Sequence, residues 1–185
     1  MKIRTFIALE IPEYVIEYIF SILSKESQHK KFKWESKEKI HLTLKFIGDF
    51  ELDKILSLIN DLSFLEEEKI QRIELKNFGM FYNKNAPTIF WAGLNISDVL
   101  FSIVERIENT LIKYDIQKEI RKFKPHLTLM RIKNYYDIDF LTRLKDVNFE
   151  PVVFESDKIV LFKSELHPTG SVYKSLHKFQ LKKTE

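Results

Sequence analysis

Apolar residues recur along this chain with two alternating periods, one typical of strands and the other of helices. Residues 3–9 form an apolar run with several β-branched side chains, which predicts a strand. Pro12 follows and suits the first turn of a helix. Over residues 14–25 the apolar positions lie three or four apart, as on one face of a helix. The chain is therefore predicted to begin with a strand and then a helix.

The same order of elements returns further along the chain. Residues 88–94 predict a strand, Ser97 or Asp98 a helix N-cap, and an apolar helical stripe then runs to Leu111. Further strands are predicted at 40–47, 70–81, 126–132, 149–154, 158–166 and 171–181. Helices are predicted after the strands at 40–47 and 126–132, on the stripes Leu52, Ile55, Leu56, Ile59, Leu62 and Ile138, Leu141, Leu144.

A short repeat accounts for this recurrence. The tetrapeptide His-Leu-Thr-Leu at residues 41–44 returns at 126–129, an offset of 126 − 41 = 85 residues, and the same offset pairs Leu56 with Leu141. No linker rich in Pro, Gly or Ser separates the two halves. We therefore expect residues 1–185 to form a single α+β domain. Its two lobes are predicted to be interleaved and related by a pseudo-two-fold axis, each an antiparallel sheet backed by helices, with a central cleft.

Side chains on a strand point alternately to the two faces of a sheet, which orients both copies of the tetrapeptide. The apolar residues are expected to face the helices, so each His and Thr is expected to face the cleft. Strict alternation predicts one face made of His41, Thr43 and Lys45 against Leu42, Leu44 and Phe46 in the first copy, and of His126, Thr128 and Met130 against Leu127, Leu129 and Arg131 in the second.

Composition narrows the chemistry that such a cleft can perform. The chain has no Cys, which excludes disulfides, thiolate nucleophiles and Cys-ligated metals. Its 30 Lys and Arg against 27 Asp and Glu give a net charge of only +3, so any role for charge depends on where the charges lie. No apolar run is long enough for a membrane helix or a signal peptide, and we expect a cytoplasmic protein without membrane association.

Two histidines facing each other suit general acid–base catalysis at phosphorus. Imidazole titrates near neutral pH, so one ring can accept a proton while the other donates one, on opposite sides of a tetrahedral centre. The hydroxyls of Thr43 and Thr128 can hydrogen-bond the non-bridging oxygens. This chemistry requires no metal, cofactor or covalent nucleophile. A two-histidine metal site is the weaker alternative, because neither His has metal-ligand spacing or a carboxylate in a matching position.

The two motifs resemble the paired signatures of the two-histidine phosphoesterase superfamily. They read His-Leu-Thr-Leu-Lys-Phe-Ile-Gly at 41–48 and Pro-His-Leu-Thr-Leu-Met-Arg at 125–131. More closely, the chain resembles the RNA 2′,3′-cyclic phosphodiesterases, also called 2′-5′ RNA ligases. The likeness extends to Arg-Thr-Phe-Ile-Ala at 4–8, Phe-Trp-Ala-Gly at 90–93 and Ser-Glu-Leu-His-Pro-Thr-Gly-Ser-Val-Tyr at 164–173, and so runs nearly from end to end.

The resemblance implies a reaction and a role for each site residue. It implies hydrolysis of RNA 2′,3′-cyclic phosphate ends to 2′-phosphates, with tRNA fragments among the candidate substrates, and reverse ligation driven by the energy stored in the cyclic phosphate. His126 is then the proton acceptor and His41 the proton donor, an assignment that the near-symmetry of the halves makes reversible. Thr43, Thr128 and Arg131 are expected to contact phosphate, and a monomer is expected.

Two residues of the second motif raise questions of geometry. Arg131 matches a basic residue of the family, yet strict alternation puts it on the face opposite His126. Either a bulge redirects it toward phosphate, or it supports the strand from behind. Met130 is bulkier than the small residue usual in the family, and it is predicted to narrow the phosphate end of the cleft.

Basic residues precede both motifs and are expected near the mouth of the cleft. Lys30, Lys31, Lys33, Lys37 and Lys39 precede the first motif, and Lys118, Arg121, Lys122 and Lys124 precede the second. They suit an RNA substrate, although solvated lysines without a ligand are the simpler reading. Phe32 and Trp34 could stack on bases or belong to the core. Two other functions stay open, namely cleavage of a small cyclic-phosphate nucleotide derivative and non-catalytic binding of RNA ends.

Overall fold

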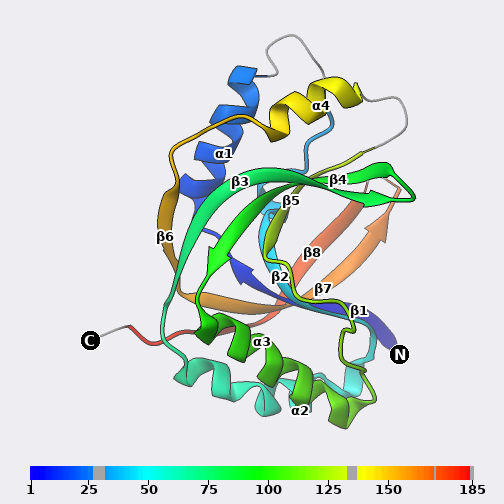
Figure 1. Ribbon diagram of the computed structural model, residues 1–185. Helices are drawn as coiled ribbons and strands as arrows, with labels where there is room; N and C mark the ends of the chain where they lie inside the picture. The colour runs from blue at the N-terminus through cyan, green and yellow to red at the C-terminus, as the bar shows by residue number, and fades with distance from the viewer. Residues whose placement is uncertain (27–31, 133–136, 169, 184–185) are drawn as a thin grey trace.

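The strands form one curled antiparallel sheet with helices on its outer side (Figure 1). The computed structural model describes residues 1–26, 32–132, 137–168 and 170–183. The strand order is β6-β3-β4-β5-β2-β1-β7-β8. The strands are β1 (Lys2–Glu10), β2 (His41–Glu51), β3 (Gln71–Asn83), β4 (Ala86–Ile96), β5 (His126–Arg131), β6 (Val152–Ser156), β7 (Lys158–His167) and β8 (Gly170–Gln180). The helices are α1 (Glu13–Glu26), α2 (Ile55–Asp61), α3 (Asp98–Leu111) and α4 (Ile138–Lys145).

The predicted α+β fold with two related lobes is confirmed, and the two expected sheets prove to be halves of one. The first lobe contains β8, β7, β1 and β2, and the second contains β6, β3, β4 and β5. The lobes are joined where β2 meets β5, through the single pair Leu42 and Leu127. These two leucines are equivalent in the repeat, since 42 + 85 = 127. The pseudo-two-fold axis therefore passes between them.

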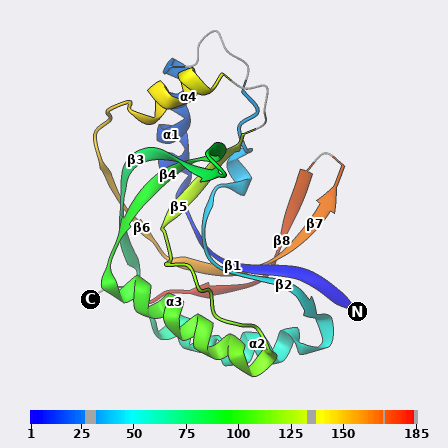
Figure 2. The ribbon, with the colours of Figure 1, turned by 45° about the vertical axis from the view of Figure 1, so that its right-hand side comes forward.

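Each half of the chain contributes one helix to the lobe that carries the other half's motif: α1 packs on the second lobe and α3 on the first. In both views α1 lies beside α4 over the second lobe, whereas α2 and α3 lie together under the first (Figures 1 and 2). The Tyr18 hydroxyl of α1 donates to the carbonyl of Glu150 at 3.2 Å, and its ring meets Phe149 edge-on. The strands are exchanged in the same way, since β3 pairs with β4 and not with β2. The buried apolar residues of both lobes form one continuous cluster between sheet and helices.

The helix after the first motif differs from its prediction. Within the stripe predicted there, Leu52 and Leu56 are 43% and 79% exposed, so that part of the prediction is wrong. Only residues 55–61 are α-helical, and a 3₁₀ turn lies on either side of them. Because a 3₁₀ turn has three residues, it changes which positions face inward, and Leu58 and Leu65 complete the buried face instead. In the helix after the second motif, Leu141 and Leu144 are buried as predicted, but Ile138 is 36% exposed, so that part of the stripe is wrong.

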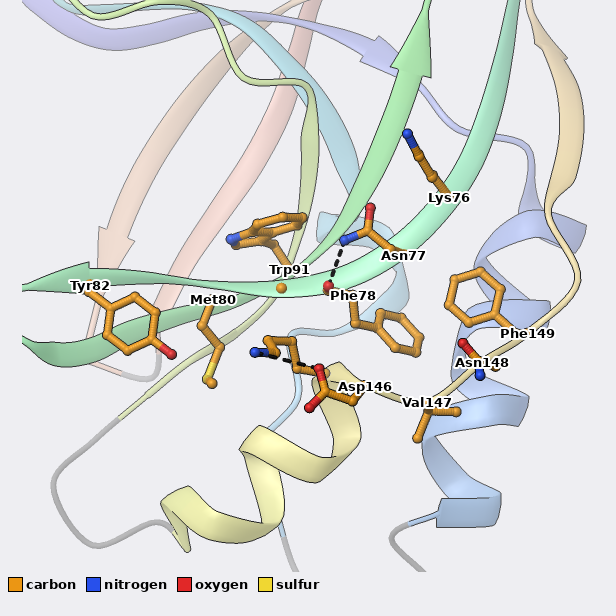
Figure 3. A pocket seen from close by; sticks show the side chains of 12 residues that line it. Lys76, Asn77, Phe78, Met80, Tyr82, Trp91, Asp146, Val147, Asn148 and Phe149 are labelled. Atoms are coloured by element: carbon orange, nitrogen blue, oxygen red, sulfur yellow. Dashed lines mark hydrogen bonds and ion pairs between the residues drawn. The ribbon is translucent and has the colours of Figure 1, made fainter.

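A glycine next to a tryptophan determines how the second lobe packs behind the cleft. Gly79 of β3 pairs with Trp91 of β4, and a Cβ added at Gly79 would lie 2.3 Å from the indole ring. In the first lobe Phe6, the equivalent of Trp91, pairs with Phe162, and the two rings stack at 5.1 Å. The larger indole is thus accommodated by the smallest residue opposite it. Figure 3 shows Trp91 and Met80 on opposite sides of β3.

Replacing Gly79 with Ala should destabilise the protein by about 1–3 kcal/mol, because the added methyl group overlaps a buried, rigid ring. Chemical denaturation of the parent and the variant measures this loss. The double variant Gly79→Ala, Trp91→Phe should recover part of it, since the smaller ring vacates the space. Within the described residues the Trp91 indole N–H has no hydrogen-bond partner, so this second change removes no hydrogen bond. Strictly additive losses would contradict the packing argument.

Candidate active site

Each of the two His-Thr strands contains a β-bulge at the same place. The pairing of β2 with β1 skips Leu44, and the pairing of β5 with β4 skips Leu129. These two residues are equivalent in the repeat, since 44 + 85 = 129. A bulge inserts one extra residue into a strand, so the side chains after it reach the face opposite to the one that alternation predicts.

The bulges correct the predicted orientation of four side chains. Strict alternation places Lys45 and Met130 beside the histidines, but they are buried under the sheet, with exposures of 3% and 0%. It places Phe46 and Arg131 on the apolar face, but both line the cleft. Met130 therefore does not narrow the cleft. Of the two alternatives for Arg131, redirection by a bulge is the one that the structure contains.

The pairing at the pseudo-two-fold axis brings the two motifs together. Residues that flank a pair in an antiparallel ladder stand opposite each other. Because Leu42 pairs with Leu127, His41 stands opposite Thr128, and by the same symmetry the second histidine stands opposite the first threonine. The two histidines are then diagonal neighbours across the junction, and His126 is near enough for its charge to act on the pKa of His41. The two motifs therefore meet in one cleft.

Two adjoining cavities occupy the cleft. One of about 350 Å³ is lined by His41, both threonines, Arg131 and a ring of further residues, namely Arg4, Phe6, Glu35, Lys39, Phe46, Ser164, Leu166, Ser171 and Tyr173. The other, of about 1090 Å³, is lined by His126 and by the loop that leads into β5. Thr43 and Phe46 line both cavities, which are therefore contiguous. The two histidines lie on either side of this junction.

Aromatic side chains enclose both imidazole rings. The His41 ring stacks on Phe6 at 5.0 Å and meets Tyr173 edge-on at 5.5 Å. The His126 ring meets Phe81 edge-on at 4.8 Å. Burial disfavours a charged imidazole, so it lowers the pKa of His41 to about 4 and also lowers the pKa of His126. A hydrogen bond to the backbone opposes this effect at each ring, while repulsion from His126, when that ring is protonated, lowers the pKa of His41 further, and the positive charge of Lys124 does so for His126.

A backbone hydrogen bond fixes the orientation of each ring. The Nδ1 atom of His126 lies 2.7 Å from the carbonyl oxygen of Lys124. A carbonyl only accepts, so Nδ1 carries the proton and Nε2 of the neutral ring is left as a proton acceptor. His41 makes the equivalent hydrogen bond with the backbone of Lys39, since 39 + 85 = 124. Both histidines are thus held by the residue two positions before them.

Arg131 extends along the side of the smaller cavity with most of its side chain, 67%, exposed. Its Nε lies 3.6 Å from Oε1 of Glu35. Sequence reasoning assigned no role to Glu35, Arg4 or Tyr173, although the opening strand's alternation does place Arg4 on the same face as Phe6. Glu35 gave no such signal. Its backbone N–H donates to the carbonyl of Leu129 at 2.7 Å, a contact that only the fold creates.

Comparison with protein families identifies the chain. The sequence model of the family described as LigT like Phosphoesterase matches it twice, over residues 9–91 and 94–173. The two matches begin 94 − 9 = 85 residues apart, which is the offset of the repeat, and together they cover most of the chain. The chain belongs to the LigT-like phosphoesterase family.

Relatives and solved structures agree with this assignment. A protein of Thermotoga maritima named RNA 2′,3′-cyclic phosphodiesterase is 32% identical over 96% of this chain and 95% of its own length. One of the same name from Methanocaldococcus jannaschii is 34% identical over 92% of this chain and 96% of its own. The crystal structure of Escherichia coli LigT complexed with 3′-AMP has a TM-score of 0.77 at 18% identity and covers 98% of this chain and 99% of that one. The crystal structure of TT0787 of Thermus thermophilus has a TM-score of 0.74 at 24% identity, with 96% and 97% covered. The last two comparisons show the fold.

The basic residues predicted near the cleft of this LigT-like phosphoesterase do not all line the cleft. Lys118, Arg121, Lys122 and Lys124 line the larger cavity. Lys39 lines the smaller cavity, and Lys33 lines a neighbouring one together with Trp34. Lys30 and Lys31 lie outside the described residues, and Lys37 pairs with Glu17 instead. Phe32 and Trp34 both pack against the core, which favours the structural reading of that pair.

Two further findings concern what the described part of the chain lacks. Within it, no group of three or more His, Asp or Glu side chains is placed to hold a metal ion. Nor is any helix there long and apolar enough to cross a membrane.

A buried ion pair holds the basic loop of the LigT-like phosphoesterase in place. Beyond the bulge, Lys45 points under the sheet and donates to both carboxylate oxygens of Glu108, at 2.9 and 2.8 Å, and to the carbonyl of Gln117, at 2.9 Å. The same carboxylate accepts from the backbone N–H of Glu119 at 3.2 Å. The pair therefore ties β2 and α3 to the start of the loop that carries the cations.

Replacing Lys45 with Met, the residue at the equivalent position 130, should destabilise the protein by about 3–5 kcal/mol, because it leaves the Glu108 carboxylate buried without a counter-charge. The double variant Lys45→Met, Glu108→Leu should regain most of this loss, since no charge remains buried. Thermal and chemical denaturation measure both effects. A single variant as stable as the parent would show that the pair contributes nothing.

Proposed function

We propose that this LigT-like phosphoesterase hydrolyses the 2′,3′-cyclic phosphate ends of RNA to 2′-phosphates. The observation that carries the proposal is the junction at Leu42 and Leu127, where two His-Thr pairs from the two halves lie across one cleft. Relatives that match nearly the whole chain and bear the name RNA 2′,3′-cyclic phosphodiesterase support the substrate.

The reaction consists of one displacement at phosphorus. The oxygen of water bonds to phosphorus while the bond between phosphorus and the 3′ oxygen breaks. One proton passes from water to the base, and the acid gives another to the departing 3′ oxygen, so the protein as a whole neither gains nor loses a proton. An RNA 5′-hydroxyl in place of water would open the same ring, with the same bond to the 3′ oxygen broken, and would give a 2′-5′ linkage without a nucleotide triphosphate.

We assign the base to His126 and the acid to His41. The neutral His126 ring, with its proton held on Nδ1, offers Nε2 to the attacking water. His41 must be protonated to act as acid, and its pKa of about 4 in the free protein opposes this. The negative charge of a bound phosphate stabilises the imidazolium and raises that pKa. In this assignment the bound substrate raises the pKa of His41 and so favours the protonated form that acts as the acid.

The remaining polar groups of the smaller cavity suit the phosphate. The hydroxyls of Thr43 and Thr128 donate to non-bridging oxygens as charge develops there. Arg131 supplies a guanidinium from the side of the cleft, in the direction that the bulge gives it. In the larger cavity the four cations before His126 outnumber the carboxylates of Glu105 and Glu119, since Glu108 is paired with Lys45, and the surplus of positive charge suits the rest of an RNA strand. A mononucleotide would leave most of that cavity empty.

Single variants His41→Ala and His126→Ala should each lower kcat/KM at least about a hundredfold, since each removes one proton transfer. The assay uses an oligonucleotide with a 2′,3′-cyclic phosphate end in EDTA, with the product identified by mass and chromatography. His177→Ala, on β8 and outside both cavities, serves as the control. Unimpaired turnover by either active-site variant would refute the mechanism, and a 3′-phosphate product would refute the bond assignment.

The same assay separates the two other functions. For an RNA substrate, kcat/KM of the oligonucleotide should fall steeply with added salt, while that of a cyclic mononucleotide changes little. Equal rates and equal salt dependence would favour a small cyclic-phosphate substrate. Tight binding without turnover would identify a non-catalytic RNA-end binder.

The pH dependence of kcat/KM should be a bell with its maximum below pH 6.5. This parameter reports the free enzyme, in which the acid must be protonated and the base neutral. The pKa values of both histidines lie below the ordinary 6.5, that of His41 at about 4, so both limbs of the bell move toward acid. Initial rates from about pH 4 to 8, with circular dichroism confirming the fold at each pH, measure the profile. A maximum above about pH 7 would contradict the burial argument.

A further inference from the structure

A carboxylate lies in the cavity that is built to hold an anion. The smaller cavity contains three cations, Arg4, Lys39 and Arg131, together with Glu35. The Glu35 side chain is only 24% exposed, and its Oε1 lies 3.6 Å from Nε of Arg131. A negative charge here weakens the binding of any phosphate, so its presence calls for a chemical reason.

The backbone holds Glu35 in this place. Its N–H donates to the carbonyl of Leu129 at 2.7 Å. Leu129 is the residue that the bulge of β5 leaves unpaired with β4, so its carbonyl is available to Glu35. The feature that turns Arg131 into the cleft thus also fixes the segment that carries the carboxylate. Glu35 is therefore part of the built site, and its position does not depend on the ion pair alone.

Substrate and product of the proposed reaction differ in charge. A cyclic phosphate is a diester with one negative charge. The 2′-phosphate product is a monoester whose second pKa lies near about 6, so above that pH it carries nearly two charges. Three cations without a counter-charge would hold the doubly charged product more tightly than the substrate. Hydrolysis would then be slowed by its own product.

We propose that Glu35 is a specificity-determining residue that repels the second negative charge of the 2′-phosphate product and thereby favours its release. The inference rests on the proposed function and adds to it a means of turnover. Arg131 still attracts the single charge of the substrate, while the nearby carboxylate acts most strongly on the species of higher charge. The other charged or titratable groups that share the cavity are Arg4, Lys39, His41 and Tyr173.

The alternative is that Glu35 only orients Arg131. In that case its loss would change the binding of singly and doubly charged ligands by the same factor. Repulsion predicts a different result, because the electrostatic effect of removing one charge scales with the charge of the ligand. The two roles are therefore separated by ligands that differ in charge and in little else.

The test compares Glu35→Gln with the parent by calorimetric binding of two ligands. Adenosine 2′-monophosphate carries nearly two charges at about pH 8 and one at about pH 5. Its 2′-methyl phosphate ester carries one charge at both pH values and corrects for titration of the protein. At the higher pH the variant should bind the monophosphate about three- to tenfold more tightly than the parent does. It should also bind the methyl ester more tightly, but only by about the square root of that factor, because the ester carries half the charge. At the lower pH the two factors should be equal.

Glu38→Gln is the matched control, since it removes the same charge from a nearby residue that lines neither cavity. It should leave both affinities unchanged. Equal factors for the two ligands at the higher pH, or no gain in the affinity for the monophosphate, would overturn the proposal. These binding measurements need no turnover. Failure of the parent to hydrolyse cyclic phosphates would count against the proposed function, and the two results are distinguishable.

Discussion

The candidate site depends on one hydrogen-bonded junction, the pair Leu42 and Leu127 on the pseudo-two-fold axis. Within the described residues, the two four-stranded halves of the sheet pair with each other at no other position. A broader ladder would continue the sheet flat across the cleft and bring the facing strands together along their whole length. A single pair lets the strands diverge at once, and the space that opens on either side becomes the two cavities. The depth of burial around the imidazoles follows from the same curvature, since the outer strands bring their aromatic side chains inward.

The paired bulges add direction to this arrangement. Up to Leu44 and Leu129, each strand presents His and Thr to the cleft and leucines to the core. Beyond these two residues the alternation is reversed, so side chains expected in the cleft face the core and side chains expected in the core face the cleft. In the first half the exchange buries Lys45, which then ties a loop to the sheet through Glu108. In the second half it buries Met130 and turns Arg131 toward the cleft. The same kind of β-bulge thus gives one lobe a buried ion pair and gives the other an arginine in the cleft.

The sequence was sufficient for the parts of this picture that depend on local periodicity and on the repeat. Strand and helix order, the offset of 85 residues and the convergence of His41 with His126 all follow from residue spacing. The orientation of Lys45 and Arg131 does not, because a bulge is defined by the register with the neighbouring strand. The buried face of the helix after the first motif was predicted wrongly for a similar reason, because the 3₁₀ turns at its ends change which residues point inward. Glu35 acquires its position from a carbonyl in the other half of the chain.

The exchange of α1 and α3 between the lobes gives the molecule the topology of a swapped dimer whose two subunits share one polypeptide. A symmetric dimer of half-length chains would have to carry the same residue at both copies of every position. It could not place an arginine beside one histidine and a phenylalanine beside the other. Covalent linkage removes that restriction, and Phe46 and Arg131 occupy equivalent positions with different chemistry. Linkage in a single chain allows the two histidines to have unequal surroundings even before substrate binds, and in the proposed mechanism this inequality favours one as the acid and the other as the base.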